Sequence, residues 1–255
     1  MAETLQGALA KAYASNPTLT GARAGQRATD ENVPLQKANG RPAADVSGSY
    51  SESILKPTIS FTAPQRTVNA QAQLNVPIYS GGTVRNGVKA AKTRVAAGQA
   101  NLRGTEASVF SQTVAAYMDV IRDSAIVALN QANVKVLDVN LQATNDRFEV
   151  GDLTRTDVAQ SESRLALARS DLQIAQSNLI TSRENYIALV GEAPDNLEPP
   201  PQLPGLPANP ETAVQVALRD NADILAAQKQ REARHYDAKA AKGGVLPRVS
   251  AFTQA

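Results

Sequence analysis

The clearest pattern in the chain is a strict alternation of apolar and polar residues over eleven positions, from Val68 to Ile78. A half-buried strand of a soluble protein averages about five or six residues, whereas a strand of a transmembrane barrel needs about 9–11, with apolar side chains toward lipid. The length therefore predicts a membrane strand. Its expected lipid face consists of Val68, Ala70, Ala72, Leu74, Val76 and Ile78.

A second alternating run precedes it and predicts the other strand of an antiparallel β-hairpin over 43–78. Val46, Gly48, Tyr50 and Ile54 alternate with polar residues, although Glu52 interrupts the apolar face. The segment 55–66 contains two prolines and is expected to be the connecting loop. Two strands alone would leave backbone groups unpaired in lipid, so other copies must close the barrel.

The period changes from two residues to that of a helix after Gly82. Two long helices are expected, over 83–149 and 153–190, because apolar residues recur every seven positions with one eleven-residue interval. A four-residue insertion in a heptad pattern unwinds a left-handed supercoil, so helix 83–149 should be superhelical at both ends and straighter between. The two series are Val88, Val95, Leu102, Val109, Val120, Val127, Val134, Leu141 and Phe148, and Val158, Leu165, Leu172, Leu179 and Tyr186.

In the second long helix each large residue of the series is followed three positions later by a partner that is usually small. Such an alternation lets helices approach closely along a seam, unlike the bulky pairs of a two-stranded zipper. The pattern suits a wall of many helices. The partner residues are Ser161, Ala168, Ala175, Ser182 and Leu189.

A further helix is expected over 3–39, with a bend near Asn32 because Pro34 removes a backbone hydrogen bond. At 1.5 Å per residue the helices 3–39, 83–149 and 153–190 would measure about 55, 100 and 57 Å, so the two shorter ones end to end match the long one. The predicted fold is mainly α. A long coiled-coil helical hairpin forms a tunnel wall, joined to an amphipathic β-hairpin that would enter a transmembrane β-barrel.

The chain also repeats itself after 205 residues without a gap. The shift places Ala8 on Ala213, Asn16 on Asn221 and Pro42 on Pro247. We expect residues 1–207 to form a first structural repeat, closed by a linker from 191, and residues 208–255 to be the truncated start of a second. The linker, 191–210, contains seven of the fourteen prolines and should be stiff and extended.

Composition narrows the classes of function. Aromatic residues make up only 4% of the chain, there is no tryptophan or cysteine, and a net charge of +2 is spread evenly, so nucleic acid binding is not implied. With one histidine and no nucleophile or phosphate-loop motif, we expect no enzyme activity, no cofactor and no metal. No apolar run is long enough for a transmembrane helix. The start Met1-Ala2-Glu3 would suit a mature sequence with an added initiator methionine.

Several short motifs together resemble the outer-membrane efflux and secretion channel proteins of the TolC family. They are 15–19 (Ser-Asn-Pro-Thr-Leu), 77–82 (Pro-Ile-Tyr-Ser-Gly-Gly), 147–151 (Arg-Phe-Glu-Val-Gly) with 156–158 (Thr-Asp-Val), and 189–191 (Leu-Val-Gly). The resemblance implies a homotrimer in the outer membrane of a Gram-negative bacterium, with a twelve-stranded barrel continued by a twelve-helix periplasmic tunnel. Such a protein passively conducts solutes or polypeptides when a periplasmic adaptor and an inner-membrane transporter dock on it.

The resemblance also implies two sites. Val150, Gly151, Asp152 and Leu153 would form the periplasmic tip that contacts the adaptor, and Thr156 with Asp157 would belong to the latch that closes the entrance. The alternative explanation of Asp157 is that it is simply an acid at a helix N-terminus, where the helix dipole favours it. The exported substrate stays open, as does the choice between a tripartite efflux pump and type I secretion.

An alternative reading is a soluble periplasmic coiled-coil adaptor or scaffold, because adaptors share the heptads. Adaptors, however, flank their hairpin with lipoyl-like β halves rather than an eleven-residue amphipathic strand.

Three copies of this chain would supply only six complete strands, fewer than the eight of small bacterial barrels. We therefore expect the chain by itself not to close a normal trimeric pore.

Overall fold

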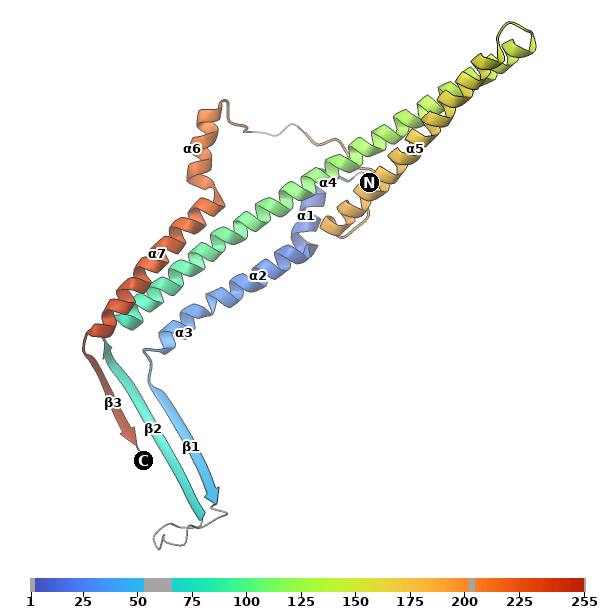
Figure 1. Cartoon of the computed structure of the whole chain (residues 1–255). Coiled ribbons are helices and arrows are strands. Elements are labelled where there is room, and N and C mark those ends of the chain that lie inside the picture. The colour runs from blue at the N-terminus through green and yellow to red at the C-terminus, as the bar shows by residue number, and fades with distance from the viewer. Residues whose placement is uncertain (1–2, 53–65, 202–204, 255) are drawn as a thin grey trace. The chain divides into compact units, whose positions relative to one another are not determined.

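The computed structural model describes residues 3–52, 66–201 and 205–254 (Figure 1). Packing divides the chain into two units, Met1–Arg23 with Leu102–Val214, and Ala24–Asn101 with Gln215–Ala255. The expected fold class is confirmed: long helices dominate and one small antiparallel sheet accompanies them. In chain order the elements are α1 Leu5–Ser15, α2 Pro17–Asp30, α3 Asn32–Ala38, β1 Ala43–Glu52, β2 Arg66–Ser80, α4 Thr83–Glu149, α5 Arg155–Val190, α6 Pro210–Asp220, α7 Ala222–Lys242, the 3₁₀ turn η1 Gly243–Val245 and β3 Arg248–Gln254.

The single helix expected over 3–39 is wrong, because the segment forms three helices. Asn16 precedes a proline and is extended, with φ −62° and ψ 123°, since the proline ring disfavours helical geometry in the residue before it. The second break lies at Glu31, beside the bend expected near Asn32. Pro34 cannot donate to the carbonyl of Asp30, where α2 ends.

The two long helices lie close to their expected bounds. Helix α4 runs unbroken from Thr83 to Glu149. Helix α5 begins at Arg155, two residues later than expected, because Thr154 is an extended N-cap with φ −96° and ψ 160°. Gly191 ends α5 in the left-handed region, at φ 88°, and its N–H donates to the carbonyl of Ile187 at 2.7 Å.

The core of the first unit lies where α1 packs against the hairpin of α4 and α5. Ala8 and Ala12 of α1 are fully buried, and their small side chains leave room for two large aromatic residues. Tyr117 and Tyr186, one from each long helix, meet there with ring centroids 6.4 Å apart and planes inclined by 51°. The core therefore combines small residues on α1 with aromatic residues on the hairpin.

The seam between the long helices is lined by the small residues that the heptads predicted. Ala168, Ala175 and Ser182 are buried at seven-residue spacing, whereas Leu172 and Leu179 are half-buried. On α4 the eleven-residue interval from Val109 to Val120 is filled by buried Thr113 and Ala116. These spacings of four, three and four residues average about 3.67 per turn, the period of an eleven-residue repeat.

In the second unit the first turns of α4 pack against both α3 and α7. A Cβ on Gly87 would lie 3.0 Å from the side-chain oxygen of Gln36. On the α7 side the hydroxyl of Thr83 donates to the carbonyl of Ala240 at 3.3 Å. Gly81, with φ +62°, approaches so closely that a Cβ there would lie 2.3 Å from the carbonyl oxygen of Gly243. This approach requires glycine at position 81.

The sheet has the order β1-β2-β3, with both pairs antiparallel (Figure 1). Tyr50 pairs with Val68 and Val46 with Ala72. Between β2 and β3 the register shifts after Pro77, which has no N–H to donate to the ladder. Every residue of β1 and β3 is exposed. The loop expected over 55–66, and Ile54 before it, lie almost wholly outside the described residues.

Elements at both ends of the chain have matching bounds. Each bound of α6 (210 and 220) equals the corresponding bound of α1 (5 and 15) plus 205, and Asn221 follows α6 as Asn16 follows α1. The copies differ afterwards, because α7 continues unbroken where α2 gives way to α3. The position of Pro34 is occupied by Lys239 under the same shift, so the residue that interrupts the first copy is absent from the second.

Candidate functional site

The expected adaptor-contact residues form a closed turn at the end of the hairpin of α4 and α5. Gly151 adopts φ +81°, and the N–H of Asp152 donates to the carbonyl of Arg147 at 2.9 Å. Arg147 also donates from Nε and Nη2 to Oδ2 of Asp152, at 2.9 and 2.7 Å. Val150 is 79% exposed and Leu153 is half-buried. The turn thus carries one exposed apolar side chain and one exposed ion pair.

The two expected latch residues lie in the first turn of α5, directly after this tip. Asp157 accepts hydrogen bonds from the N–H of Thr154 at 2.9 Å and from its hydroxyl at 2.7 Å, while its own N–H donates to that hydroxyl at 3.4 Å. This is a complete capping box. The hydrogen bonds from Thr154 lower the pKa of Asp157, with a smaller contribution from the charge of Arg147. Thr156 is exposed. The latch role itself stays a prediction.

The register of the sheet brings the expected lipid face of β2 opposite the apolar positions of β1. Val68 faces Tyr50, Ala70 faces Gly48, Ala72 faces Val46 and Leu74 faces Ala44. Because directly paired residues of neighbouring strands share a face, the apolar positions of both strands line one side of the hairpin. Val68 and Ile78 are 76% and 67% exposed. What covers this face stays a prediction.

The proline-rich linker folds back onto the first unit, which the sequence did not predict. Glu3 and Leu197 form an isolated parallel bridge, in which the N–H of Glu3 donates to Asn196 at 3.2 Å. The hydroxyl of Tyr117 lies 2.9 Å from the carbonyl oxygen of Glu3 and 2.5 Å from that of Glu198. Burial is the main cause that raises the pKa of Tyr117. No motif signals this docking, because it depends on backbone groups.

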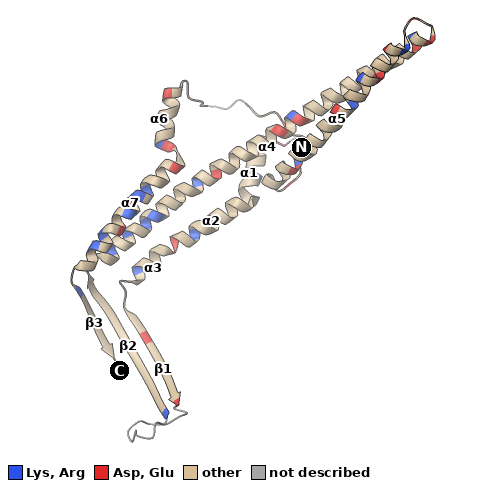
Figure 2. Cartoon of the chain, in the orientation of Figure 1, with Lys and Arg blue, Asp and Glu red and all other residues tan. Residues whose placement is uncertain are grey.

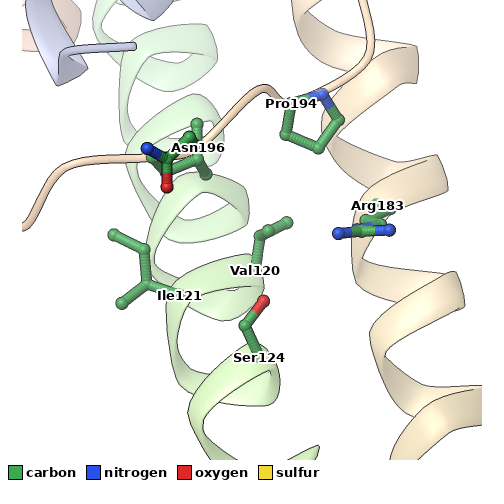
Figure 3. A pocket seen from close by; sticks show the side chains of 7 residues that line it. Val120, Ile121, Ser124, Arg183, Pro194 and Asn196 are labelled. Atoms are coloured by element: carbon green, nitrogen blue, oxygen red, sulfur yellow. The ribbon is translucent and has the colours of Figure 1, made fainter. Parts of the chain in front are cut away.

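A pocket of about 230 Å³ lies between the docked linker and the two long helices (Figure 3). Val120, Ile121 and Ser124 contribute from α4, and Pro194 and Asn196 from the linker. Arg183 extends from α5 toward it. Within the ranges that the structure describes, Arg183 makes no ion pair. The pocket thus combines an apolar wall with one guanidinium, and nothing in it resembles catalytic machinery.

A buried acid connects the two long helices, and sequence reasoning missed it. Asp123 of α4 is 5% exposed and accepts a hydrogen bond from the hydroxyl of Ser182 on α5. Arg122 donates to both of its oxygens, at 2.8 and 3.1 Å. The Arg122 guanidinium, helped by Ser182, lowers the pKa of Asp123 against the opposing effect of burial. The available signal was its position three residues after Val120, on the seam of α4.

Residues 3–52, 66–201 and 205–254 contain neither a metal-binding cluster nor a membrane-spanning helix. Within them, histidine and acidic side chains nowhere gather in the threes that would hold a metal ion. No helix of this part of the chain has both the length and the hydropathy needed to cross a membrane.

Comparison with known proteins gives consistent relatives. BepC, an outer membrane efflux protein of Brucella suis biovar 1 (strain 1330), is 38% identical over 98% of this chain and 54% of its own length. The crystal structure of CusC has a TM-score of 0.82 at 18% identity, and covers 98% of this chain and 60% of CusC. VceC, an outer membrane protein of Vibrio cholerae, has a TM-score of 0.75 at 23% identity, with coverage of 98% and 62%.

The chain spans about half the length of BepC. A family model described as outer membrane efflux protein matches residues 8–192, which include most of the docked α1, the sheet hairpin β1–β2 and both long helices. This description places the family in the outer membrane, and the resemblance carried by the short motifs is confirmed. The chain belongs to the family of outer membrane efflux proteins.

Proposed function

We propose that the protein containing this chain is a protomer of a trimeric channel-tunnel of the outer membrane. It passively conducts exported solutes or polypeptides, as the exit duct of a tripartite efflux pump or a type I secretion system. One observation supports this proposal most directly: a sheet with an exposed apolar face continues, through Gly81 and Gly82, into a 67-residue helix. A strand that enters lipid and a helix that extends from it are the parts of a channel with a periplasmic extension.

The edges of the sheet support assembly with further strands. In the order β1-β2-β3, each outer strand has one neighbour among the described residues and therefore one unpaired side. Unpaired backbone N–H and C=O groups are strongly unfavourable in lipid. Strands from other copies, or from the rest of the protein, would pair with these edges and close the sheet.

The hairpin of α4 and α5 supports side-by-side assembly of copies. Leu129 and Val136 of α4 are 70% and 64% exposed, and Leu167 and Ile174 of α5 are 65% and 57% exposed. Each pair is spaced by seven residues, the interval at which a packed helix repeats its contact face. Isolated hairpins gain nothing from exposed apolar heptads, whereas neighbouring helices in a tunnel wall would bury them.

Within this function the tip and the first turn of α5 take the roles expected by resemblance. Val150, Gly151, Asp152 and Leu153 would contact a periplasmic adaptor, with exposed Val150 as the apolar contact. Thr156 and Asp157 would contribute to the entrance latch. The inner-membrane transporter would supply the energy and the substrate choice, and the channel itself would carry out no reaction and need no cofactor.

The repeat organisation is part of the proposal. We assign 1–207 to a first structural repeat and 208–255 to the beginning of a second, because α6, Asn221 and α7 follow α1, Asn16 and α2 at a constant shift. Under this assignment α6 would meet a helical hairpin of its own repeat in the way that α1 meets α4 and α5.

The test is reconstitution of the full-length protein into planar bilayers, with its oligomeric state measured in detergent. We expect a detergent-dependent trimer whose single channels open in discrete current steps and stay open over a range of applied voltages. For the latch, Asp157→Asn should raise the conductance of the resting channel, whereas Thr154→Ala, which removes the cap and leaves the carboxylate, should not. A monodisperse particle in plain buffer that conducts no ions would contradict the proposal and would favour a soluble periplasmic adaptor.

A further inference from the structure

The junction between helices and sheet in the second unit carries an uncompensated positive charge. The segment 81–101 contains Arg85, Lys89, Lys92 and Arg94 and no acidic residue, and 238–254 contains three further cations and no acid. Figure 2 shows Lys and Arg gathered on α7 and on the first turns of α4. We call the exposed members the junction cations: Arg85, Lys89, Lys92, Lys239, Lys242 and Arg248.

Contacts between α4 and α7 combine these residues into one surface. The side chains of Lys89 and Lys239, from different helices, both lie over the ring of Tyr236, with each Nζ 5.6 and 5.7 Å from its centroid. Asp237 is the acid nearest to Lys239 in sequence, and its carboxylate is already paired with Arg94. The junction cations therefore face solvent without carboxylate partners among the residues that the structure describes.

Several cations elsewhere in the chain are paired with acids, whereas the junction segments 81–101 and 238–254 contain no acid at all. Arg122 pairs with Asp119 and Asp123, Arg147 with Asp152, and Arg169 with Asp138. A solvated helix face normally alternates its charges in this way. Six exposed cations without such partners point to an anionic surface outside the chain.

Exposed apolar side chains lie directly beside the junction cations. Val245 is 88% exposed and follows Lys242 by three residues, and Phe252, four residues after Arg248, is 74% exposed. Ile78 and Tyr79, at the end of β2, are 67% and 50% exposed. A cationic layer bordering an apolar layer with an aromatic residue is the arrangement that an interface between lipid and water favours.

We propose that the junction cations bind the phosphate headgroups of anionic phospholipids at the periplasmic surface of the outer membrane. This inference rests on the proposed function, because it requires the sheet to enter that membrane. Basic side chains near an anionic bilayer each strengthen binding several-fold, and the attraction falls with ionic strength. The junction would then fix how deeply the sheet enters the bilayer.

The test compares binding of the chain to phosphatidylcholine vesicles with and without about 30 mol% phosphatidylglycerol. The variant Arg85→Gln/Lys89→Gln/Lys242→Gln removes three junction cations. The matched control Arg103→Gln/Lys135→Gln/Arg164→Gln removes three exposed cations from the first unit. Circular dichroism confirms that each variant keeps the helical content of the parent chain.

We expect the parent chain and the control to prefer the anionic vesicles, and the junction variant to lose on the order of 100-fold in affinity for them. All three should bind neutral vesicles equally, because the apolar face of the sheet is unchanged. Equal binding of all three to both vesicles would overturn the headgroup proposal and leave membrane entry intact. Binding to neither vesicle would overturn both. Two other results would also overturn the headgroup proposal. One is that inorganic phosphate displaces the chain from vesicles more strongly than chloride does at equal ionic strength. The other is that the chain shows no preference between the vesicles but binds peptidoglycan sacculi through the junction cations.

Discussion

The hydroxyl of Ser182 on α5 donates a hydrogen bond to the buried carboxylate of Asp123 on α4. The same helices meet again at Thr144 and Ser161, whose hydroxyl oxygens lie 3.4 Å apart. The two contacts are separated by 21 residues on each helix, which is three heptads. These two polar contacts occupy the same heptad position, and they favour one register of the hairpin over a slipped one. Slippage would leave buried Asp123 without the hydroxyl of Ser182.

Replacement of Ser182 by alanine should lower the free energy of unfolding by about 1.5–3 kcal/mol, because it removes a hydrogen bond to a buried charged group. Ser170→Ala changes an exposed serine of the same helix and serves as the control. Urea unfolding followed by circular dichroism measures both. Equal losses in the two variants would show that the contact with Asp123 contributes nothing specific.

Stability should depend on pH through Asp123. Its pKa is lowered in the folded state below the ordinary value of 3.8, chiefly by Arg122. A lowered folded-state pKa means that the contribution to stability is present above the unfolded value and is lost as the pH falls through the folded value. The parent chain should therefore lose more stability than Asp123→Asn between about pH 5 and pH 2. If the urea unfolding midpoints of the two proteins fell equally over this pH range, Asp123 would not be the group responsible.

Asn16 and Asn221 occupy equivalent positions but should respond differently to the same substitution. The side-chain nitrogen of buried Asn16 donates to the carbonyl of Leu189 at 3.1 Å, near the C-terminus of α5. Asn16→Asp replaces this donor by a carboxylate close to the negative helix end, and should cost about 1–3 kcal/mol.

In exposed Asn221 the side-chain oxygen accepts hydrogen bonds from the N–H groups of Asp223 and Ile224. Asp and Asn are about equally good N-caps, so Asn221→Asp should change stability by less than about 0.5 kcal/mol. Thermal unfolding of both variants provides the comparison. Equal effects at the two positions would mean that the contact with Leu189 is unimportant.

Gly81 should tolerate alanine far less than its neighbour Gly82, although both have positive φ, +62° and +80°. A Cβ at Gly81 meets the backbone oxygen of Gly243, whereas at Gly82 the nearest atom, on Asn86, is 3.6 Å away. Gly82→Ala should cost about 1–2 kcal/mol for left-handed geometry alone, and Gly81→Ala clearly more. Hydrogen exchange in α7 reports the difference, since only Gly81→Ala should loosen the contact with that helix. Matching exchange in the two variants would exclude the close approach.

The capping box at the tip should control local order rather than global stability. Thr154→Ala removes the hydroxyl that accepts from the N–H of Asp157 and donates to its carboxylate, a change typically worth about 1 kcal/mol. Amide exchange at 155–158 should speed up, while the core around Tyr117 stays protected. Thr156→Ala changes an exposed threonine two residues later and serves as the control. Unchanged exchange in Thr154→Ala would show that the cap does not hold the first turn of α5.

Local patterns predicted most of the elements because their periods follow from the backbone. A two-residue period can only place alternate side chains on opposite faces of a strand, and the heptads of 83–149 gave helix α4 its observed bounds. The break at Asn16 was missed, although Pro17 signals it, because the apolar pattern continues through the position.

The candidate site was predictable to a smaller extent. The tip at Val150–Leu153 lies between two periodic segments and is therefore visible in the sequence. The docking of Leu197 against Glu3 is not, since a backbone bridge between residues 194 positions apart leaves no pattern in either segment. Likewise Asp157 could be a latch or a cap from its sequence alone, and the geometry of Thr154 shows the cap.

The sequence by itself therefore determined the element types, the amphipathic face of Val68–Ile78, the small-residue seam and the family. These features depend on side-chain period and on short motifs, which are local. Only the tertiary structure decided that Ser182 meets Asp123, that the proline-rich linker returns to α1, and that the cations of α4 and α7 share one surface. These relationships depend on which distant segments pack together, and packing selects among many partners that the same local patterns allow.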